Sequence, residues 1–409
     1  MAGIARSLAS ASIEAEIRPV LEGFAKLDCE LIQYKICSTF DSSPQTGSFG
    51  PAISLARELF GAVGLPVLPA QPEFGRYTVF GNHFARAGRE TFRLDRHPTM
   101  SRHPSTPIDE ADLRRFLELQ VDGPVALFDL VTLHGGDEEA QLAHLAQLRA
   151  ARPVAIVFDA VENDDLIRVA RLLLRDASQR RLESGTPAAR MPIVALGSGG
   201  LGYGFGAAFT ADVPPRAIPA GLPAVEKLLV VSGSCAPQTA EQIRWALEHG
   251  WRGVRVDPFA VDTEKRRGHD ALVNLLNAEV MTMLAKSERG VVVYSALGPS
   301  DSNSADGASL ASVLGECLGQ IVGHVFEKTG LRRAIVSGGD TSGYATRALG
   351  AESLEIIVPL VPAGALCRLS SSGRPHVDGA EIMLKGGQVG NRELFEVVRT
   401  ADANATGTR

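Results

Sequence analysis

Short apolar runs alternate with longer amphipathic stretches along most of this chain. Strands of a parallel sheet are buried on both faces and read as continuous apolar runs, and crossover helices separate them. We expect strands at 31–36, 66–68, 125–130, 154–158, 193–196, 227–231, 252–256, 291–295, 333–336, 355–358 and 381–384. We expect helices between them, among them 138–151, 164–175, 239–248, 270–285 and 310–328, with a short helix after 336. The pattern predicts an α/β fold in which mostly parallel sheets are flanked by helices.

Two segments interrupt this alternation. Residues 84–109 are rich in Arg, His, Pro, Ser and Thr and lack apolar periodicity, so we expect a long loop there. Four prolines fall within 214–223, which excludes a helix or a central strand and indicates a domain boundary. We therefore expect a domain at 1–213, a linker at 214–226, a second domain at 227–398 and a disordered tail at 399–409.

Composition narrows the class of protein. Among 409 residues, 45% are hydrophobic and 22% are charged, as in ordinary globular proteins. The net charge of −6, without a Lys/Arg-rich block, argues against a nucleic-acid partner, and no apolar run has the length of a membrane span. Five widely spaced cysteines without a CxxC pair indicate reduced thiols, hence a cytoplasmic protein. The composition is compatible with either a monomer or a homodimer.

Three glycine-rich turns follow predicted strands in the second half. They are Ser232-Gly233-Ser234, Gly338-Gly339-Asp340-Thr341-Ser342 and Lys385-Gly386-Gly387-Gln388-Val389-Gly390. Ligands of parallel sheets gather at the carboxyl ends of strands, where backbone N–H groups and helix N-termini attract anions. We therefore expect the three turns on one sheet edge, with Asp340 as a Mg²⁺ ligand. Each turn also has an ordinary interpretation: a plain strand-to-helix turn, a helix N-cap or a solvated lysine. None matches GxxxxGK[ST] or GxGxxG.

Thr239 and Gln242 have the spacing of a capping box, which places a helix start near Thr239.

In the first half, hydroxyl groups, a lysine and a carboxylate cluster after the first predicted strand. Lys35 suits the carboxylate of a polyhydroxylated acid, and Ser38, Thr39 and Asp41 suit its hydroxyls. The alternative is a polar turn with Asp41 capping the next helix.

Other candidates are less specific. Arg76 and the loop with His97, Arg102 and His103 would add positive charge, although both histidines precede proline and also suit turns. Carboxylates and a further donor-rich turn follow other predicted strands, at Asp129, Asp159 and Gly197-Ser198-Gly199-Gly200-Leu201-Gly202.

Taken together, these segments resemble the four-carbon acid sugar kinase family, long catalogued as a domain of unknown function. Lys35-Ile36-Cys37-Ser38-Thr39-Phe40-Asp41-Ser42-Ser43, continuing to Gly50, resembles the branch that phosphorylates 3-oxo-tetronate. The other matches are Gly75-Arg76, His103-Pro104-Ser105-Thr106-Pro107, Asp159-Ala160-Val161, Gly197-Ser198-Gly199-Gly200 and the three turns of the second half.

The resemblance implies ATP- and Mg²⁺-dependent phosphorylation of the terminal hydroxyl of a small sugar acid, in a cleft between the two domains. As catalytic residues it implies Asp41, Lys35 and Asp159. As substrate-binding residues it implies Lys35, Ser38, Thr39, Asp41, Arg76, His103, Ser198 and Gly199. As ATP-binding residues it implies Ser232, Gly233, Ser234, Gly338, Gly339, Asp340, Thr341, Lys385 and Gly387.

The sequence departs from the family pattern in two places. The family's N-terminal strand with Asp-Asp-Phe-Thr-Gly is missing from this sequence, so we expect weak or no turnover of the chain as given. Either the start codon is assigned too late, and an in-frame segment upstream in the DNA would supply the strand, or the protein lacks this strand. The final loop reads Lys-Gly-Gly-Gln-Val-Gly where the family has Lys-Ser-Gly-Asn-Phe-Gly. Alternatives are a non-catalytic binding relic, a kinase for threonate, erythronate or a branched 3-oxo acid, and a nicotinamide-dependent dehydrogenase, against which the absent GxGxxG argues.

Overall fold

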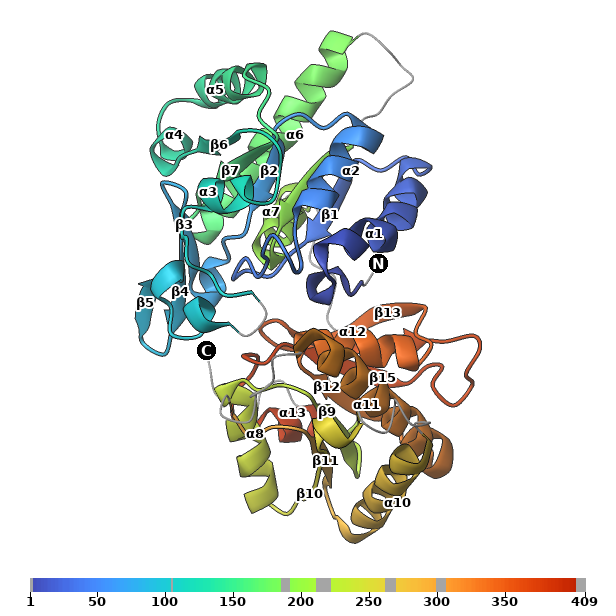
Figure 1. The fold of residues 1–409 in the computed structure, drawn as a ribbon. Coiled ribbons are helices and arrows are strands. Elements are labelled where there is room, and N and C mark those ends of the chain that lie inside the picture. The colour runs from blue at the N-terminus through green and yellow to red at the C-terminus, as the bar shows by residue number, and fades with distance from the viewer. Residues whose placement is uncertain are drawn as a thin grey trace. The chain divides into compact units, whose positions relative to one another are not determined.

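The computed structural model describes residues 3–103, 106–184, 192–210, 222–261, 270–298 and 307–401. The chain divides into two compact units, residues 5–215 and residues 216–409, and residues 1–4 belong with the second unit (Figure 1). We call them the N-terminal and the C-terminal domain. Much of the predicted linker at 214–226 lies outside the described residues, as does the predicted tail from residue 402 onward.

A five-stranded parallel sheet forms the centre of the N-terminal domain. Its order is β1-β8-β2-β7-β6, with β1 Leu31–Lys35, β8 Ile193–Gly197, β2 Leu65–Leu68, β7 Ala155–Phe158 and β6 Val125–Phe128. Every residue of β2, β7 and β8 is buried, which explains why these strands read as continuous apolar runs. The five strands predicted for this half are confirmed to within two residues at each end.

Helices cover both faces of this sheet. They are α1 Ser10–Ala25, α2 Gly50–Phe60, α3 Leu113–Glu118, α4 Leu130–His134, α5 Glu138–Ala150, α6 Asn163–Ser184 and α7 Gly199–Phe209. Buried side chains of α1, α2 and α3 form one apolar core with the sheet, and those of α4 to α7 form a second core. The predicted helix at 164–175 is the first part of α6, which continues for nine further residues.

The prediction of a loop over residues 84–109 is wrong for its first part. An antiparallel three-stranded sheet forms there, with β3 Arg76–Val79, β4 Asn82–Ala87 and β5 Glu90–Arg93, followed by the 3₁₀ turns Leu94–Arg96 and Met100–Arg102. The strands are short and mostly polar because one side of the small sheet is exposed, so the apolar run expected of a buried strand is missing.

The C-terminal domain is built on a seven-stranded sheet. Its order is β10-β11-β9-β12-β15-β14-β13, with β10 Arg252–Arg255, β11 Gly290–Tyr294, β9 Leu228–Ser232, β12 Arg333–Ser337, β15 Glu381–Lys385, β14 Gly364–Ser370 and β13 Ser353–Val361. β14 and β13 pair antiparallel and the other five strands run parallel. The predicted strands are confirmed, and β14 is an additional strand that the pattern did not indicate.

Helices flank this sheet on both faces. They are α8 Pro237–Glu248, α10 Asp270–Lys286, α11 Gly307–Thr329, α12 Gly339–Ala348 and α13 Leu394–Thr400. Apolar residues of α10, α11 and α12 pack on one face, and those of α8 and α13 pack on the other (Figure 1). The sheet therefore exposes its ends, and the loops at the carboxyl ends of its strands can carry polar groups.

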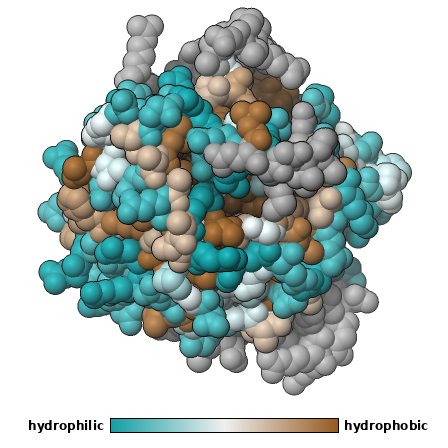
Figure 2. Space-filling view, turned by 90° about the horizontal axis from the view of Figure 1, so that it is seen from above, coloured by the Kyte–Doolittle hydropathy of each residue, from teal (hydrophilic) through white to brown (hydrophobic). Residues whose placement is uncertain are grey.

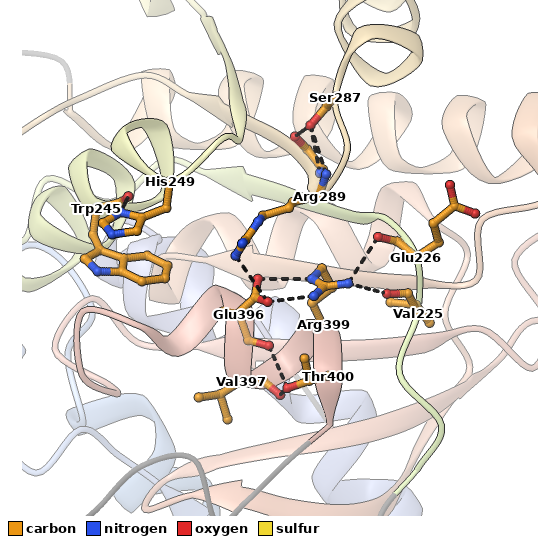
Figure 3. Close-up of polar contacts among 11 residues, drawn as sticks. Val225, Glu226, Trp245, His249, Ser287, Arg289, Glu396, Val397, Arg399 and Thr400 are labelled. Carbon is orange, nitrogen blue, oxygen red and sulfur yellow. Dashed lines mark hydrogen bonds and ion pairs between the residues drawn. The ribbon is translucent and has the colours of Figure 1, made fainter.

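Arginines join α13 to the segment that leads into β9 (Figure 3). Arg399 donates to the carbonyl oxygens of Val225 at 3.0 Å and Glu226 at 3.3 Å. Its Nε and Nη2 atoms bind the carboxylate of Glu396 at 3.0 and 2.6 Å, and Arg289 reaches the same carboxylate at 3.4 Å. These contacts hold the residues just before β9 against α13.

Hydrophilic side chains cover most of the face seen in Figure 2, and hydrophobic ones lie among them in small groups. All five cysteines are free thiols. None of the helices in the described part of the chain combines the length and the apolar character needed to cross a membrane.

Candidate functional site

The loop after β1 is shaped by one buried aromatic residue. Phe40 has a φ of 58°, a left-handed conformation that is unusual for a residue with a side chain, and its N–H donates to the Cys37 carbonyl at 3.0 Å. The fully buried ring packs edge-on against Phe49 and tilted against Phe116. This packing holds the turn and directs the polar side chains on either side of Phe40 together.

Asp41 lies just after this turn and is 5% exposed. Its Oδ1 atom accepts a hydrogen bond from the Thr39 hydroxyl at 2.5 Å, and its Oδ2 atom forms an ion pair with Arg6 at 2.9 Å. Burial acts to raise the pKa of the Asp41 carboxyl, but the charge of Arg6 and the Thr39 hydrogen bond outweigh it, so that pKa lies below its usual range. Asp41 is therefore ionised at neutral pH.

Two further basic side chains, those of Arg76 and His103, lie near enough to this carboxylate to act on it electrostatically. Burial lowers the pKa of Arg76, while the nearby Cys37 and Asp41 act in the opposite direction. The Nη1 atom of Arg76 donates to the Phe74 carbonyl at 2.6 Å, and its Nε atom is buried without a hydrogen-bond partner. The Nδ1 atom of His103 accepts from the Thr106 N–H and hydroxyl at 3.1 and 2.9 Å. The structure thus brings Thr39, Asp41, Arg76 and His103 into one cluster, and their role in substrate binding stays a prediction.

His97 has a different place. Its Nδ1 atom accepts from the N–H groups of Thr99 and Met100, so it builds the turn, which was its alternative interpretation.

Two residues of this cluster were not expected from the sequence. Arg6 belongs to a short 3₁₀ turn near the N-terminus, and no motif signals its pairing with Asp41. His83 lies on β4 and is fully buried; its Nε2 atom donates to the Ser38 carbonyl at 2.8 Å, and its Nδ1 atom accepts from the Thr78 hydroxyl at 3.0 Å. The signal that could have found His83 is the β3–β4 hairpin, whose turn contains Gly81 with a φ of 78°.

Acidification should weaken the N-terminal domain through His83. Burial lowers the pKa of His83 from 6.5 to about 4. Between pH 6.5 and pH 4, His83 is therefore protonated in the unfolded chain and neutral in the folded chain. Between pH 7 and pH 5 we expect a loss of about 2 kcal/mol from the free energy of unfolding. His83→Gln keeps one donor and one acceptor but cannot titrate, and urea unfolding of the full chain should show a smaller acid loss.

The exposed His249, which directly follows α8 and lies outside this cluster, provides the control: His249→Gln should leave the acid sensitivity of the N-terminal domain as it is. Equal acid sensitivity in wild type and His83→Gln would contradict the assignment.

Lys35, Ser198 and Gly199 lie side by side at the edge of the sheet. Lys35 is the exposed last residue of β1 and pairs in register with Gly197, the last residue of β8. The Ser198 hydroxyl accepts from the Gly200 N–H at 3.0 Å and donates to the Ala70 carbonyl at 3.0 Å, so Ser198 is the N-cap of α7. The predicted substrate-binding residues here are one lysine and a helix N-terminus, an arrangement that suits a carboxylate.

Asp159 lies apart from the Asp41 contacts. Its carboxylate is completely buried and accepts from the N–H groups of Phe80 at 2.6 Å, Gly81 at 2.9 Å and Leu130 at 3.1 Å. Burial raises its pKa, and these three hydrogen bonds act against that rise. Asp129 caps α4 by accepting from the Thr132 N–H at 2.8 Å. Through these hydrogen bonds, Asp159 and Asp129 hold the backbone of the loops and the helix start around them in place.

In the C-terminal domain, the three glycine-rich turns leave from three neighbouring strands, β9, β12 and β15. Ser232, Ser337 and Lys385 are the last residues of these strands and lie in one register row. The backbone ladder continues past them, with Gly233 N–H bonded to the Ser337 carbonyl at 3.1 Å and Gly338 N–H bonded to the Lys385 carbonyl at 3.0 Å. The predicted gathering of the turns on one sheet edge is confirmed.

The glycines let these turns pack against one another. A Cβ atom on Gly233 would lie 2.3 Å from Thr341 Oγ1, and one on Gly387 would lie 2.7 Å from Ser234 Oγ. Gly338 has a φ of 114° and precedes α12, whose N-terminus has no side-chain cap. The edge is therefore compact, and a helix with no side-chain cap begins there, as at anion sites.

The predicted capping box is wrong. Proline 237 starts α8, as proline often does at the first helical position, and no side chain caps that end. Thr239 and Gln242 are buried inside the helix and hold the third turn: the Thr239 hydroxyl donates to the Gly387 carbonyl at 2.8 Å, and Gln242 Nε2 donates to the carbonyls of Val389, Gly390 and Asn391 at 2.9–3.1 Å.

Lys385 is also buried, with 1% exposure. Its Nζ atom donates to the hydroxyls of Thr239 at 2.9 Å and Ser337 at 3.0 Å, and burial lowers the pKa of this amine to about 7. The lysine therefore lies beneath the turns and is not a solvated surface group.

Asp340 is partly exposed in the first turn of α12 and supplies carboxylate oxygens at this edge, which fits a hard cation such as Mg²⁺. Among the residues that the structure describes, three potential ligands converge elsewhere, at His134, Glu162 and Asp165. There the Asp165 carboxylate already binds His134 and the N–H groups of Val161 and Glu162.

Comparison with known proteins identifies both domains. Residues 1–191 match the model of a sugar-binding N-terminal domain, and residues 229–395 match that of a nucleotide-binding C-terminal domain. The 3-oxo-isoapionate kinase of Paraburkholderia graminis is 35% identical over 416 residues, which cover 98% of this chain and 84% of that protein. The 3-oxo-tetronate kinase of Pseudomonas fluorescens is 30% identical over 397 residues, which cover 95% of this chain and 83% of that protein.

Solved structures share the fold. A protein from Salmonella typhimurium, described as a putative tRNA synthase, aligns with a TM-score of 0.69 at 24% identity over 96% of this chain and 86% of its own. A Haemophilus influenzae protein of a family of unknown function aligns with a TM-score of 0.63 at 21% identity over 97% and 87%. With the sequence matches, this shows that the chain belongs to the family of sugar-acid kinases with a sugar-binding N-terminal and a nucleotide-binding C-terminal domain, and is a phosphotransferase that acts on an alcohol group.

Proposed function

We propose that this chain transfers the γ-phosphoryl group of Mg·ATP to the terminal hydroxyl of a small 3-oxo sugar acid. The observation that carries the proposal is the ionised carboxylate of Asp41 at the carboxyl end of β1, with the cations Arg6 and Arg76 around it. A carboxylate among cations can orient a hydroxyl group while its neighbours attract an anion.

In this proposal the N-terminal domain holds the acid. Lys35, next to the N-terminus of α7, and Arg76 bind its carboxylate, and Ser38 and Thr39 bind its hydroxyls. Asp41 accepts a hydrogen bond from the attacking hydroxyl and orients its oxygen. Phosphoryl transfer requires mainly such positioning and charge stabilisation, so a carboxylate of low pKa suffices. We leave Asp159 out of the reacting groups because its oxygens already bind three N–H groups.

The C-terminal domain holds ATP in the same proposal. Backbone N–H groups of the three turns and the N-terminus of α12 face the phosphates, and Asp340 would hold Mg²⁺. When bound, this ion would neutralise charge on the phosphates.

Two acids are the first to test. The relative at 35% identity is named a 3-oxo-isoapionate kinase, and relatives at 27–30% identity are named 3-oxo-tetronate kinases. The residue pattern after β1 resembled that of the 3-oxo-tetronate branch. The higher sequence identity to the 3-oxo-isoapionate kinase makes 3-oxo-isoapionate the first acid to test and 3-oxo-tetronate the second.

The test is ADP formation from Mg·ATP with each acid, measured in wild type and two variants. We expect Lys35→Met to raise KM for the acid roughly tenfold and to leave KM for Mg·ATP unchanged, because it removes one charged contact. Asp340→Asn should do the reverse. The proposal fails if the folded protein forms no ADP with either acid, and the division between domains fails if both variants act only by lowering thermal stability.

A further inference from the structure

The amine of Lys385 is buried, so direct contact with a phosphate does not explain its place in the proposed nucleotide site. Lys385 ends β15, in the same register row as Ser337 and Ser232, and its side chain is 1% exposed. A lysine that touches bound phosphate from the solvent side would be exposed when no phosphate is present. This amine lies behind the backbone of the turns instead.

The hydrogen bonds of Lys385 fit a neutral amine. Nζ donates to two hydroxyl groups, those of Thr239 at 2.9 Å and Ser337 at 3.0 Å. The Thr239 hydroxyl donates its hydrogen bond to the Gly387 carbonyl at 2.8 Å, so toward Nζ it can only act as an acceptor. A neutral amine has two hydrogen atoms for these two acceptors, whereas an ammonium group has a third that needs another acceptor.

Among the described residues, no anion pairs with a charge at this position. The charged groups on the neighbouring helices are Glu241, Arg244 and Glu248 on α8 and Asp340 and Arg347 on α12. Those on the neighbouring strands are Glu381, Arg333 and Arg368, at the far ends of β15, β12 and β14. None of them forms an ion pair with Lys385 in the described part of the chain, and Glu381 binds Arg333 at 2.6 Å. Glu381 is four residues away along the strand, about 13 Å.

The helices beside Lys385 add positive potential. Both α8 and α12 begin at this edge, and neither N-terminus carries a side-chain cap. Helix N-termini bear partial positive charge, which opposes protonation of a nearby amine and favours an anion. Consistent with this, burial lowers the pKa of Lys385 from 10.5 to about 7.

We propose that Lys385 couples nucleotide binding to proton uptake: the amine takes up a proton when nucleotide phosphates bind above the three turns, and the ammonium group then balances their charge through the turns. This deepens the proposed function and rests on the nucleotide site assigned there. The Lys385 ammonium group keeps its hydrogen bonds to the two hydroxyl groups. Its third N–H points toward the negative charge of the phosphates. Nucleotide affinity therefore falls as pH rises above neutrality, where the amine is neutral before binding.

The test is calorimetric titration with Mg·ADP in buffers of different ionisation enthalpy. Wild type should take up roughly 0.9 proton per nucleotide at pH 8 and roughly 0.5 at pH 7. Above pH 7.5, Kd should rise about tenfold per pH unit, a measurement that needs no variant. Lys385→Met should bind Mg·ADP more weakly at pH 7, without proton uptake.

Stability provides an independent readout. The folded chain holds the Lys385 proton less tightly than the unfolded chain, so a charged Lys385 opposes folding at neutral pH. Lys385→Met should therefore raise the unfolding temperature of the nucleotide-free chain by a few degrees. Lys227, at the opposite end of β9, donates to the Leu284 carbonyl at 2.9 Å and gives the matched control. Lys227→Met should leave proton uptake and Kd unchanged.

The possible failures are distinct. If wild type does not bind Mg·ADP, the proposed nucleotide site is wrong. If it binds without proton uptake at pH 8, or if uptake persists in Lys385→Met, the nucleotide site stands and the coupling through Lys385 is wrong.

Discussion

Arg333→Met is expected to lower the free energy of unfolding of the C-terminal domain by about 3–5 kcal/mol. Arg333 begins β12 and is 1% exposed. Its Nε atom binds Glu381 at 2.6 Å, Nη1 donates to the carbonyls of Val398 and Arg399 at 3.1 and 3.3 Å, and Nη2 donates to the Pro223 carbonyl at 3.1 Å. Methionine would fill the space and leave a carboxylate and three carbonyl groups without their donor.

The magnitude follows from the number of separate elements that one guanidinium joins. Arg333 binds the end of α13, the first residue of β15 and the segment that enters the domain, and removal of one partner of a buried ion pair costs more than the pair contributes. Lysine has no planar fork, so Arg333→Lys should restore only part of the loss.

Urea unfolding of the full chain, followed by the fluorescence of Trp245 and Trp251 in the C-terminal domain, measures this effect. The neighbouring Arg332 is the control, since it is exposed and donates to the carbonyls of His376 and Asp378 at the surface. Arg332→Met should cost less than about 1 kcal/mol. Similar losses in both variants would show that the buried network is not the cause.

The sheets and the edge where the three glycine-rich turns meet were predictable from the sequence because they depend on local patterns. Strands such as β9 and β12 are buried throughout and read as apolar runs, and each is followed by the small residues that a compact turn requires. Strands of a parallel sheet end on one edge, so three such turns had to meet there. What the pattern could not show is that the glycines pack against neighbouring turns, because that depends on which strands are adjacent.

The wrong capping box and the contacts that the sequence did not indicate have a common physical origin: each polar side chain binds an element that is distant in the sequence. Thr239 and Gln242 have capping-box spacing, but their side chains bind a turn that is distant in the sequence. His83 and Lys385 are polar residues buried by elements distant in sequence, and Arg6 reaches Asp41 across the β1 loop. No local periodicity encodes such contacts, and they determine the electrostatics of both candidate sites.

Asp41→Asn is expected to lower kcat/KM for the sugar acid roughly 100-fold. Each carboxylate oxygen has a second lone pair beyond its bond to Thr39 or Arg6, so an ionised Asp41 can still accept a hydrogen bond from a substrate hydroxyl. Asparagine keeps the shape but loses the charge and one acceptor, and it leaves Arg6 and the other cations uncompensated. Steady-state kinetics with the acid varied at saturating Mg·ATP measures the loss.

Asp129 provides the matched control on the same sheet edge. It follows β6 and caps α4, so Asp129→Asn removes a comparable charge that the proposed reaction does not use. We expect it to change kcat/KM less than about threefold and to cost little stability, because asparagine caps a helix N-terminus about as well as aspartate does. If Asp129→Asn reduces kcat/KM as much as Asp41→Asn does, general loss of charge at this edge explains both. If Asp41→Asn instead raises KM for Mg·ATP, the carboxylate serves the nucleotide. Only a loss confined to Asp41 and to the acid supports its role in orienting the hydroxyl that attacks the phosphoryl group.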